Sequence, residues 1–198
     1  GWMAAADLRD NEYDNYVTFI DCTDMGAWAG CVVGDPSSDN FTEEKVKAVY
    51  GEVKVRLSEP LVMTLNGRYD QIDYDYTDTL DSDKDGNKVF KVPSYRLGMN
   101  YALQDNLDLY ANASTGFRTP TARQLFVGIS SPSQRVDPNP NLKAEKSVNL
   151  EIGLRTSTEL FGEPLDLDVA VFQIERQDYI NPSSGIYSTG TDNIYENV

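Results

Sequence analysis

The residues best suited to chemistry form an acidic segment near the middle of the chain, residues 81–87. Oxygen-bearing side chains recur there at alternate positions: Asp81, Asp83, Asp85 and Asn87. In the first half of a calcium loop such side chains converge on one cation, and a glycine like Gly86 permits the sharp turn. The second half does not match, because the twelfth position is Val92 where a bidentate Glu is needed. The segment predicts either a weak calcium site or a solvated acidic hairpin loop between residues 70 and 93.

A second candidate for chemistry is the pair Cys22 and Cys31, the only cysteines of the chain. Eight residues separate them, which is too far for a redox pair of the C-x-x-C type. We expect a disulfide that pins a loop, worth about 2.5–3 kcal/mol in the chain-entropy model. Such a bond indicates an oxidising compartment. Trp28 lies within the same loop and is a candidate ligand contact.

The composition argues against catalysis and against nucleic acids. The chain contains no His, so it cannot build a Ser-His-Asp or Cys-His arrangement. It also lacks a glycine-rich phosphate loop. With 17 basic and 32 acidic residues the formal net charge is −15, which repels phosphate backbones. We therefore expect neither an enzyme nor a nucleic-acid-binding protein.

Three pairs of segments must position these residues, and each pair is joined by a short turn. Within every segment apolar and polar residues alternate, which predicts strands with one apolar and one polar face. The apolar positions of the first pair are Val49, Val53, Val55 and Leu57, then Leu61, Met63, Leu65 and Tyr69. Those of the second are Tyr95, Leu97, Met99, Tyr101 and Leu103, then Leu107, Leu109, Ala111 and Ala113. Those of the third are Val148, Leu150, Ile152 and Leu154, then Leu165, Leu167, Val169 and Val171.

Short turns that alternate with long polar loops are typical of an antiparallel transmembrane β-barrel, although an antiparallel soluble sandwich shows the same alternation. Charges such as Arg96, Glu151 and Asp168 would then face a wet lumen. Six or seven strands cannot close, since such barrels need at least about eight. Residues 194–198 resemble the start of another strand, so we expect an all-β segment of a larger barrel.

One stretch of about 70 residues, from 110 to 180, carries more specific motifs. It contains Gly-Phe-Arg-Thr-Pro at 116–120, Asn-Pro-Asn-Leu-Lys-Ala-Glu at 139–145 and Asn-Leu-Glu-Ile-Gly at 149–153. Their order and spacing resemble the barrel of a TonB-dependent outer-membrane receptor. Thr119 and Ala144 depart conservatively from the Ala and Pro usual in that family.

The resemblance implies a barrel of about 22 strands with long extracellular loops, in the outer membrane of a Gram-negative bacterium. We expect residues 1–44 to form an extracellular loop region that holds the disulfide. Residues 45–198 would supply barrel strands and loops, without the plug domain. The resemblance also implies TonB, ExbB and ExbD as partners, reached through the plug, and lipid around the barrel.

The implied function is active uptake of a scarce nutrient, with a ferric siderophore as the first candidate. Haem ranks lower, because residues 122–138 contain neither His nor Tyr to ligate iron. Arg118, Arg123 and Arg135 are candidate contacts for an anionic ferric chelate. The alternative is a calcium-binding β-domain of a secreted or cell-surface adhesin, which the acidic segment and the disulfide would suit.

Overall fold

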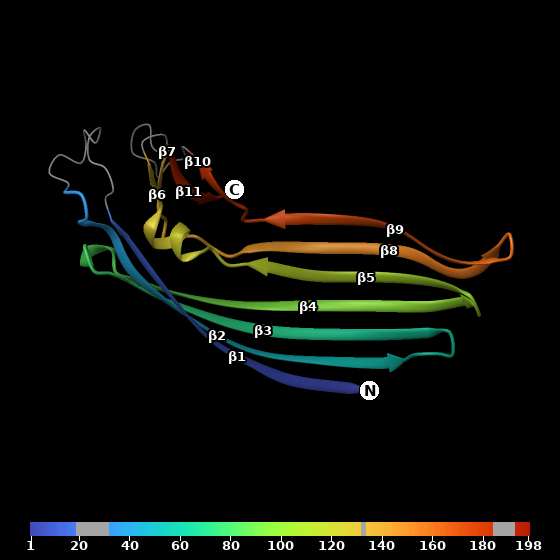
Figure 1. Ribbon diagram of the computed structural model, residues 1–198. Helices are drawn as coiled ribbons and strands as arrows, with labels where there is room; N and C mark the ends of the chain where they lie inside the picture. Colours follow the sequence, from blue (N-terminus) through green and yellow to red (C-terminus); the bar gives the residue numbers. More distant parts are fainter. Residues whose placement is uncertain (19–31, 132–133, 184–192) are drawn as a thin grey trace.

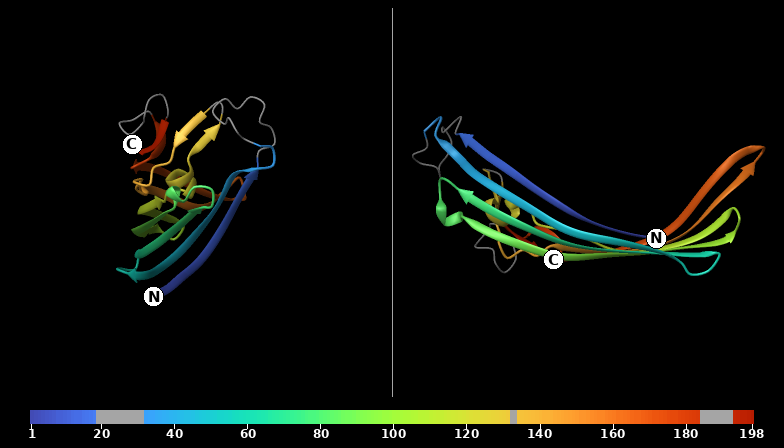
Figure 2. Two further views of the ribbon diagram at one scale, coloured as in Figure 1. Left: turned by 90° about the vertical axis from the view of Figure 1, so that its left-hand side faces the viewer. Right: turned by 90° about the horizontal axis from the view of Figure 1, so that it is seen from below.

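A computed structural model describes residues 1–18, 32–131, 134–183 and 193–198. Seven long strands form one antiparallel sheet in the order β1-β2-β3-β4-β5-β8-β9. Their bounds are β1 Trp2–Thr18, β2 Pro36–Arg56, β3 Leu61–Asp78, β4 Gly86–Gln104, β5 Leu107–Arg118, β8 Glu145–Leu160 and β9 Glu163–Gln177. The sheet is bent into a trough whose concave side we call the inner face (Figure 2). The predicted all-β, antiparallel barrel segment is confirmed.

The three predicted strand pairs are present with the predicted short turns. These turns lie together at one end of the sheet, and the longer connections lie at the other (Figure 1). We call these the turn end and the loop end. The turn between β8 and β9 places Phe161 and Gly162 at φ angles of 54° and 84°, and glycine adopts that backbone region without strain.

The strands are longer than the sequence suggested. β3 continues to Asp78 and β4 begins at Gly86, so the loop predicted between residues 70 and 93 shrinks to residues 79–85. Residues 1–44, which we expected to form a loop region, contain strand residues in both of their described parts. β1 pairs with β2 from Trp2 opposite Val53 onward, and residues 36–44 belong to β2.

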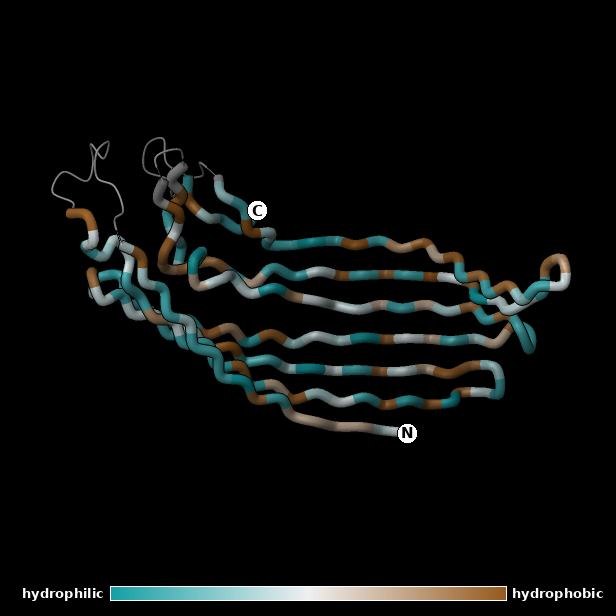
Figure 3. The backbone as a smooth tube through the Cα atoms, in the orientation of Figure 1, coloured by the Kyte–Doolittle hydropathy of each residue, from teal (hydrophilic) through white to brown (hydrophobic). Residues whose placement is uncertain are grey.

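The sheet changes character along its length, as the hydropathy of the backbone in Figure 3 indicates. Near the turn end the apolar side chains point outward and are exposed; they include Val53, Leu65, Met99 and Ile152. Near the loop end six large apolar side chains of β2–β4 point inward and are buried: Val46, Ile72, Tyr74, Tyr76, Phe90 and Val92. We call the outward apolar zone near the turn end the belt.

A second, four-stranded sheet lies at the loop end, in the order β10-β11-β7-β6 (Figure 1). Its strands are β6 Ile129–Ser131, β7 Gln134–Asp137, β10 Ile180–Ser183 and β11 Asn193–Asn197. The predicted strand at residues 194–198 is therefore β11, which belongs to this small sheet. Two short helical turns accompany the strands, η2 Ser82–Lys84 and η3 Arg123–Val127. No helix in the described ranges is long and apolar enough to cross a membrane.

The small sheet, η3 and the segment of residues 138–144 pack against the inner face of the long sheet, and we call these three parts together the loop cap. One cluster of buried side chains joins the two parts. From the cap it includes Leu125, Phe126, Val136, Leu142, Ile180 and Tyr195. The hydrophobic core among the described residues is thus at the loop end, where it fixes two long connections against the strands.

Candidate functional site

The inner face near the turn end holds a compact polar cluster. The carboxylate of Asp168 on β9 accepts hydrogen bonds from the Tyr110 hydroxyl at 2.8 Å and from Arg155 Nε and Nη2 at 3.0 and 2.8 Å. The Arg155 guanidinium also lies over the Tyr110 ring, 5.2 Å from its centroid. Three strands are therefore joined by a charge-assisted network on the face that the sequence predicted to line a lumen.

A glycine makes that cluster possible. Gly153 is the cross-strand partner of Tyr110, and a Cβ at this position would come within 2.5 Å of the Tyr110 Cζ atom. The tyrosine ring therefore lies directly over the β8 backbone. Covering a strand glycine with an aromatic ring compensates for the side chain that glycine lacks.

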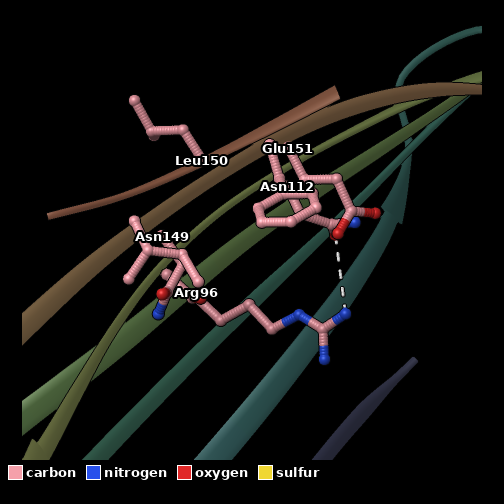
Figure 4. Close-up of a pocket in the computed structure, with 8 residues that line it drawn as sticks. Arg96, Asn112, Asn149, Leu150 and Glu151 are labelled. Atoms are coloured by element: carbon pink, nitrogen blue, oxygen red, sulfur yellow. Dashed lines mark hydrogen bonds between the residues drawn. The ribbon is translucent and has the colours of Figure 1, made fainter. Parts of the chain in front are cut away.

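Further toward the loop end the inner face is hollowed by about 390 Å³ (Figure 4). Polar side chains from three strands line this hollow, and two apolar residues of β9 close one side: Arg96, Asn112, Ser114, Asn149, Glu151, Phe172 and Ile174. Arg96 Nη2 donates a long hydrogen bond of 3.5 Å to Asn112 Oδ1. Glu151 lies on the inner face, as predicted, and so does Asn149, while Leu150 between them points away.

The Asn-Pro-Asn-Leu motif anchors the loop cap. Asn139 is buried; its Nδ2 donates to the carbonyl of Tyr195 at 2.8 Å, and its Oδ1 accepts from the Asn141 amide at 2.9 Å. Leu142 is only 1% exposed within the cap core. Asn197 continues the seam, since its Oδ1 accepts from the Lys143 amide at 2.8 Å. The motif thus joins two connections that lie more than fifty residues apart in the chain.

A second anchor joins the cap to the long strands. Arg118 Nε at the end of β5 donates to Glu145 Oε2 at 2.8 Å, and a second bond joins Arg118 Nη2 to Glu145 Oε1. The same carboxylate accepts from the amide of Ile180, at the start of β10, at 2.8 Å. Both charged residues lie beyond the belt. The Arg118 hydrogen bond, followed by that of the Ile180 amide, lowers the pKa of Glu145 against the opposing effect of burial.

Aromatic rings fill the space between the cap and β3. Tyr76 stacks on Phe126 of η3 with ring centroids 5.2 Å apart, and Gly86 leaves room for the Phe126 ring because a Cβ there would lie 2.8 Å from it. The neighbouring Tyr74 hydroxyl lies 3.3 Å from the Thr119 hydroxyl. Burial and the nearby Asp78 raise the pKa of Tyr76, whose hydroxyl donates to Asp78.

The predicted ligand contacts fall in different places. Cys22, Trp28 and Cys31 lie outside the described residues, so the disulfide and the Trp28 contact stay predictions. Arg118 is engaged by Glu145, and Arg123 Nε donates to the carbonyl of Gly128 at 3.1 Å within the turn that follows η3. Arg135 lies on β7 of the cap. The three arginines thus all belong to the cap or to its anchor.

The acidic segment adopts a geometry of its own. The carboxylate of Asp81 accepts the amide of Asp83 at 3.3 Å and pairs with Lys84 at 3.2 Å. The carboxylate of Asp85 accepts the amide of Asp78 at 2.8 Å, while Asn87 begins to pair with β3. Within the described ranges no three His, Cys, Asp or Glu side chains are grouped so that they could hold a metal ion. The predicted calcium site gains no support from this arrangement and stays a prediction.

The sequence reasoning missed the aromatic part of the cap core, above all Tyr74, Tyr76 and Phe126. A signal was present: residues 72, 74 and 76 are all apolar or aromatic and alternate with Asp73 and Asp75. In residues 72–76 the apolar side chains stand at even positions, whereas in residues 61–69 they stand at odd positions. This change made the strand seem to end at residue 69.

Comparisons with known proteins agree on one family. The family model described as "TonB dependent receptor-like, beta-barrel" matches residues 1–198. Among curated proteins, "Hemoglobin-haptoglobin utilization protein B" of Neisseria meningitidis serogroup C is 36% identical over 87 residues, 44% of this chain and 10% of that protein.

Two solved structures share the fold at low sequence identity. "Copper transporter OprC" aligns with a TM-score of 0.71 at 18% identity, covering 100% of this chain and 30% of that one. The ferric-catecholate import receptor Fiu of E. coli aligns at 0.67 and 14% identity, covering 99% and 30%. The chain therefore spans about a tenth of the curated relative and about a third of the solved structures.

Proposed function

The chain belongs to the family of TonB-dependent receptor β-barrels, and on that premise we propose that the receptor it forms part of takes up a scarce nutrient across the outer membrane. The family lies in the outer membrane of Gram-negative bacteria and consists of transport receptors. The alternative of a secreted adhesin domain is therefore set aside. TonB, with ExbB and ExbD, is the proposed energy source, acting through the plug domain of the receptor.

The observation that supports transport best is the opposite polarity of the two faces at the turn end. The belt exposes Leu65, Met99 and Ile152 outward, while the Tyr110–Arg155–Asp168 cluster lies on the inner face directly behind it. These charged side chains would be costly if they faced lipid, but they stay solvated if they face water or a polar plug. This arrangement suits the wall of a polar channel.

The loop cap supplies the entrance to that channel. It packs on the inner face at the loop end, and its core fixes the connection after β5 to the connection after β9. We propose that ligand contacts the outer surface of the cap and residues 19–31, with Trp28, Arg123 and Arg135 as contacts. Arg118 is assigned to holding the cap, since both bonds to Glu145 engage its guanidinium.

A ferric siderophore is the first proposed ligand, because the chain has no His to ligate haem iron. Haem bound to a carrier protein is the second, and one observation favours it: the curated relative at 36% identity is a haemoglobin-haptoglobin utilisation protein. A carrier protein would be recognised through contacts with loops rather than through an iron ligand in this chain. The two ligands would therefore be recognised by different kinds of contact with the same cap.

The test is growth under iron limitation of a strain that lacks the receptor, complemented with the full-length gene. Ferric siderophores of the catecholate and hydroxamate classes, free haemin and haemoglobin are each supplied as the sole iron source. We expect siderophore-dependent growth that is lost when TonB is deleted. Growth only on haemoglobin would move the proposal to the second ligand. Growth that persists without TonB would contradict energised uptake by this receptor.

A further inference from the structure

The acidic residues of the chain are concentrated at the loop end of β1–β4. Residues 10–18, 35–45 and 73–87 form this region, which we call the acidic rim. Its basic residues are Lys45 and Lys84. It holds thirteen carboxylates: Asp10, Glu12, Asp14, Asp35, Asp39, Glu43, Glu44, Asp73, Asp75, Asp78, Asp81, Asp83 and Asp85. The rim therefore carries most of the formal net charge of −15.

The carboxylates of the rim include like charges that face each other directly. In the register of the sheet Glu12 lies opposite Glu43, and Glu43 lies opposite Asp75, so three carboxylates form one row across β1–β3. Like charges in direct opposition destabilise a sheet. Lys45 offsets only part of this row, through its contact with Glu43 at 2.6 Å. The chain thus keeps a concentrated negative charge at a cost in stability, which is typical of a functional surface.

Basic side chains near the rim are engaged within the protein. Lys84 pairs with Asp81 at 3.2 Å, and Lys88 Nζ donates to a backbone carbonyl of the cap at 2.7 Å. The guanidinium groups of Arg118 and Arg123 are also held, the first by a carboxylate and the second by a backbone carbonyl. These four cations therefore serve first to hold the rim and the cap in their folded arrangement.

The field of the rim acts on a charged ligand before any contact is made. Many charges of one sign on one surface raise the association rate of ligands of the opposite sign by factors of about 10–10³, and they slow ligands of the same sign. Salt screens this effect over about 8–10 Å at physiological ionic strength. Because the rim and the cap lie at the same end of the sheet (Figure 1), a ligand that reaches the cap passes through this field.

We propose that the acidic rim selects a cationic ferric chelate, of the trihydroxamate class with a free ammonium group, over a ferric tricatecholate. This inference rests on the proposed uptake of a ferric siderophore. Each hydroxamate brings one negative charge, so three of them neutralise Fe³⁺ and a free ammonium group makes the chelate cationic. Each catecholate brings two negative charges, so the ferric tricatecholate is trianionic. The rim attracts the first chelate and repels the second.

The experiment measures association rates by stopped-flow quenching of tryptophan fluorescence, with the full-length receptor purified in a non-ionic detergent. The probes are a linear ferric trihydroxamate with a terminal ammonium group, the same chelate acetylated on that nitrogen, and a ferric tricatecholate. The acetylated chelate is the matched control, because it differs only at the group that carries the charge. At low salt we expect the cationic chelate to associate about tenfold faster than the acetylated one, and the tricatecholate to be slowest. High salt should bring the first two rates to within about twofold of each other.

Two triple variants of the receptor test the rim itself. Asp14→Asn, Asp35→Asn, Asp83→Asn neutralises three exposed carboxylates of the rim, and we expect the ratio of the cationic to the acetylated rate to fall by about half. The matched variant Glu59→Gln, Asp105→Asn, Glu163→Gln removes the same number of exposed charges at the turn end and should keep the ratio. A heat-dependent shift in gel mobility establishes that both variants have folded.

Equal rates for the cationic and the acetylated chelate at low salt would overturn the proposal. So would faster association of the tricatecholate, or an equal fall of the ratio in both triple variants. Growth on each chelate as the sole iron source separates this inference from the proposed function. TonB-dependent growth that is best on the tricatecholate would refute selection by the rim and leave siderophore uptake standing, whereas growth on none of the chelates would refute both.

Discussion

The two halves of β3 are built on opposite rules. In residues 61–69 the outward side chains Leu61, Met63 and Leu65 are apolar, and the inward ones from residue 64 onward are polar. In residues 70–78 the inward side chains Ile72, Tyr74 and Tyr76 are apolar and buried, and Asp73 and Asp75 point outward. The strand continues without interruption across this change. The period of an alternating pattern therefore reports a strand, whereas its phase reports which side of the strand meets water.

The same inversion occurs in β4, from Phe90 and Val92 inside to Leu97 and Met99 outside. Near the turn end lipid covers the outward side chains. The buried cluster of the described residues therefore does not extend to this end. Near the loop end the sheet carries its own cover, the loop cap. The two halves should then lose different amounts of stability after the same kind of substitution.

The largest expected effect is a difference in stability loss between the cap and the belt when one leucine is truncated in each. Leu142→Ala removes a side chain that is 1% exposed in the cap core, and we expect a loss of about 2–5 kcal/mol in the stability of the cap. Leu150→Ala removes a belt side chain that is 48% exposed, and its effect should be much smaller. Hydrogen exchange of the amides in residues 134–142 and 193–198 measures the cap directly. Equal losses for the two variants would contradict the division.

A charge placed on adjacent residues of β3 tests the belt in the same way. Met63→Lys puts an ammonium group on the outward face, where a lipid-facing charge costs up to about 2–4 kcal/mol at the bilayer midplane and less toward the interfaces. Thr64→Lys, one residue further, puts the same group on the inner face and should cost far less. Urea unfolding of the receptor in lipid vesicles measures both. The outward assignment of Met63 would be wrong if Thr64→Lys were the more damaging change.

The phase inversion also explains how far the sequence alone could go. Alternation with constant phase predicted the belt halves of all three strand pairs and their turns. It did so because every apolar side chain of a belt half points to the outward face. At Tyr69 and Tyr95 the phase changes, and the polar residues beyond them, such as Asp73 and Asp75, suggested a loop. β1 was missed for a similar reason, since its outward positions pass from Ala4, Ala6 and Leu8 to Asp10 and Glu12.

The residues of the candidate site also differ in how far the sequence could predict their positions. Local spacing was enough to place Arg96, Glu151 and Asp168 on the inner face. It could not reveal that Asn139 bonds Tyr195, or that Glu145 bonds Arg118 and Ile180, because these contacts join segments far apart in the chain. Asn139 and Leu142, which the sequence offered only as part of a family motif, hold the loop cap. Long-range pairing, rather than residue type, decided their role.

A smaller loss of stability is expected at Gly153, whose missing side chain leaves room for the Tyr110 ring on the inner face. Gly153→Ala places a Cβ 2.5 Å from the Tyr110 Cζ atom, so the ring must leave the Asp168 carboxylate. We expect a loss of about 1–3 kcal/mol in the free energy of unfolding. Gly67→Ala is the matched control, because its Cβ meets only the Tyr95 ring at 3.9 Å.

The cause is tested by a double variant. Removing the ring in Tyr110→Ser should make a further Gly153→Ala change nearly neutral, since nothing then occupies the space above the β8 backbone. If Gly153→Ala costs as much with serine at position 110 as with tyrosine, the glycine is not required by the ring.

The smallest expected effect is a pH dependence that belongs to the loop end alone. Hydrogen bonds from Arg118 and Ile180 lower the pKa of Glu145, so the folded cap binds this proton more weakly than the unfolded chain does. The stabilisation is fully present above the ordinary glutamate value of 4.5 and is lost as pH falls through the lower folded pKa. The protection of the Ile180 amide, its exchange rate relative to the intrinsic rate at each pH, should therefore fall as the pH drops below 4.5. In Glu145→Gln that step should vanish, whereas Glu163→Gln at the turn end should keep it. A step that survives in Glu145→Gln would mean that another carboxylate anchors the cap, and the two halves of the molecule would then differ in packing but not in charge.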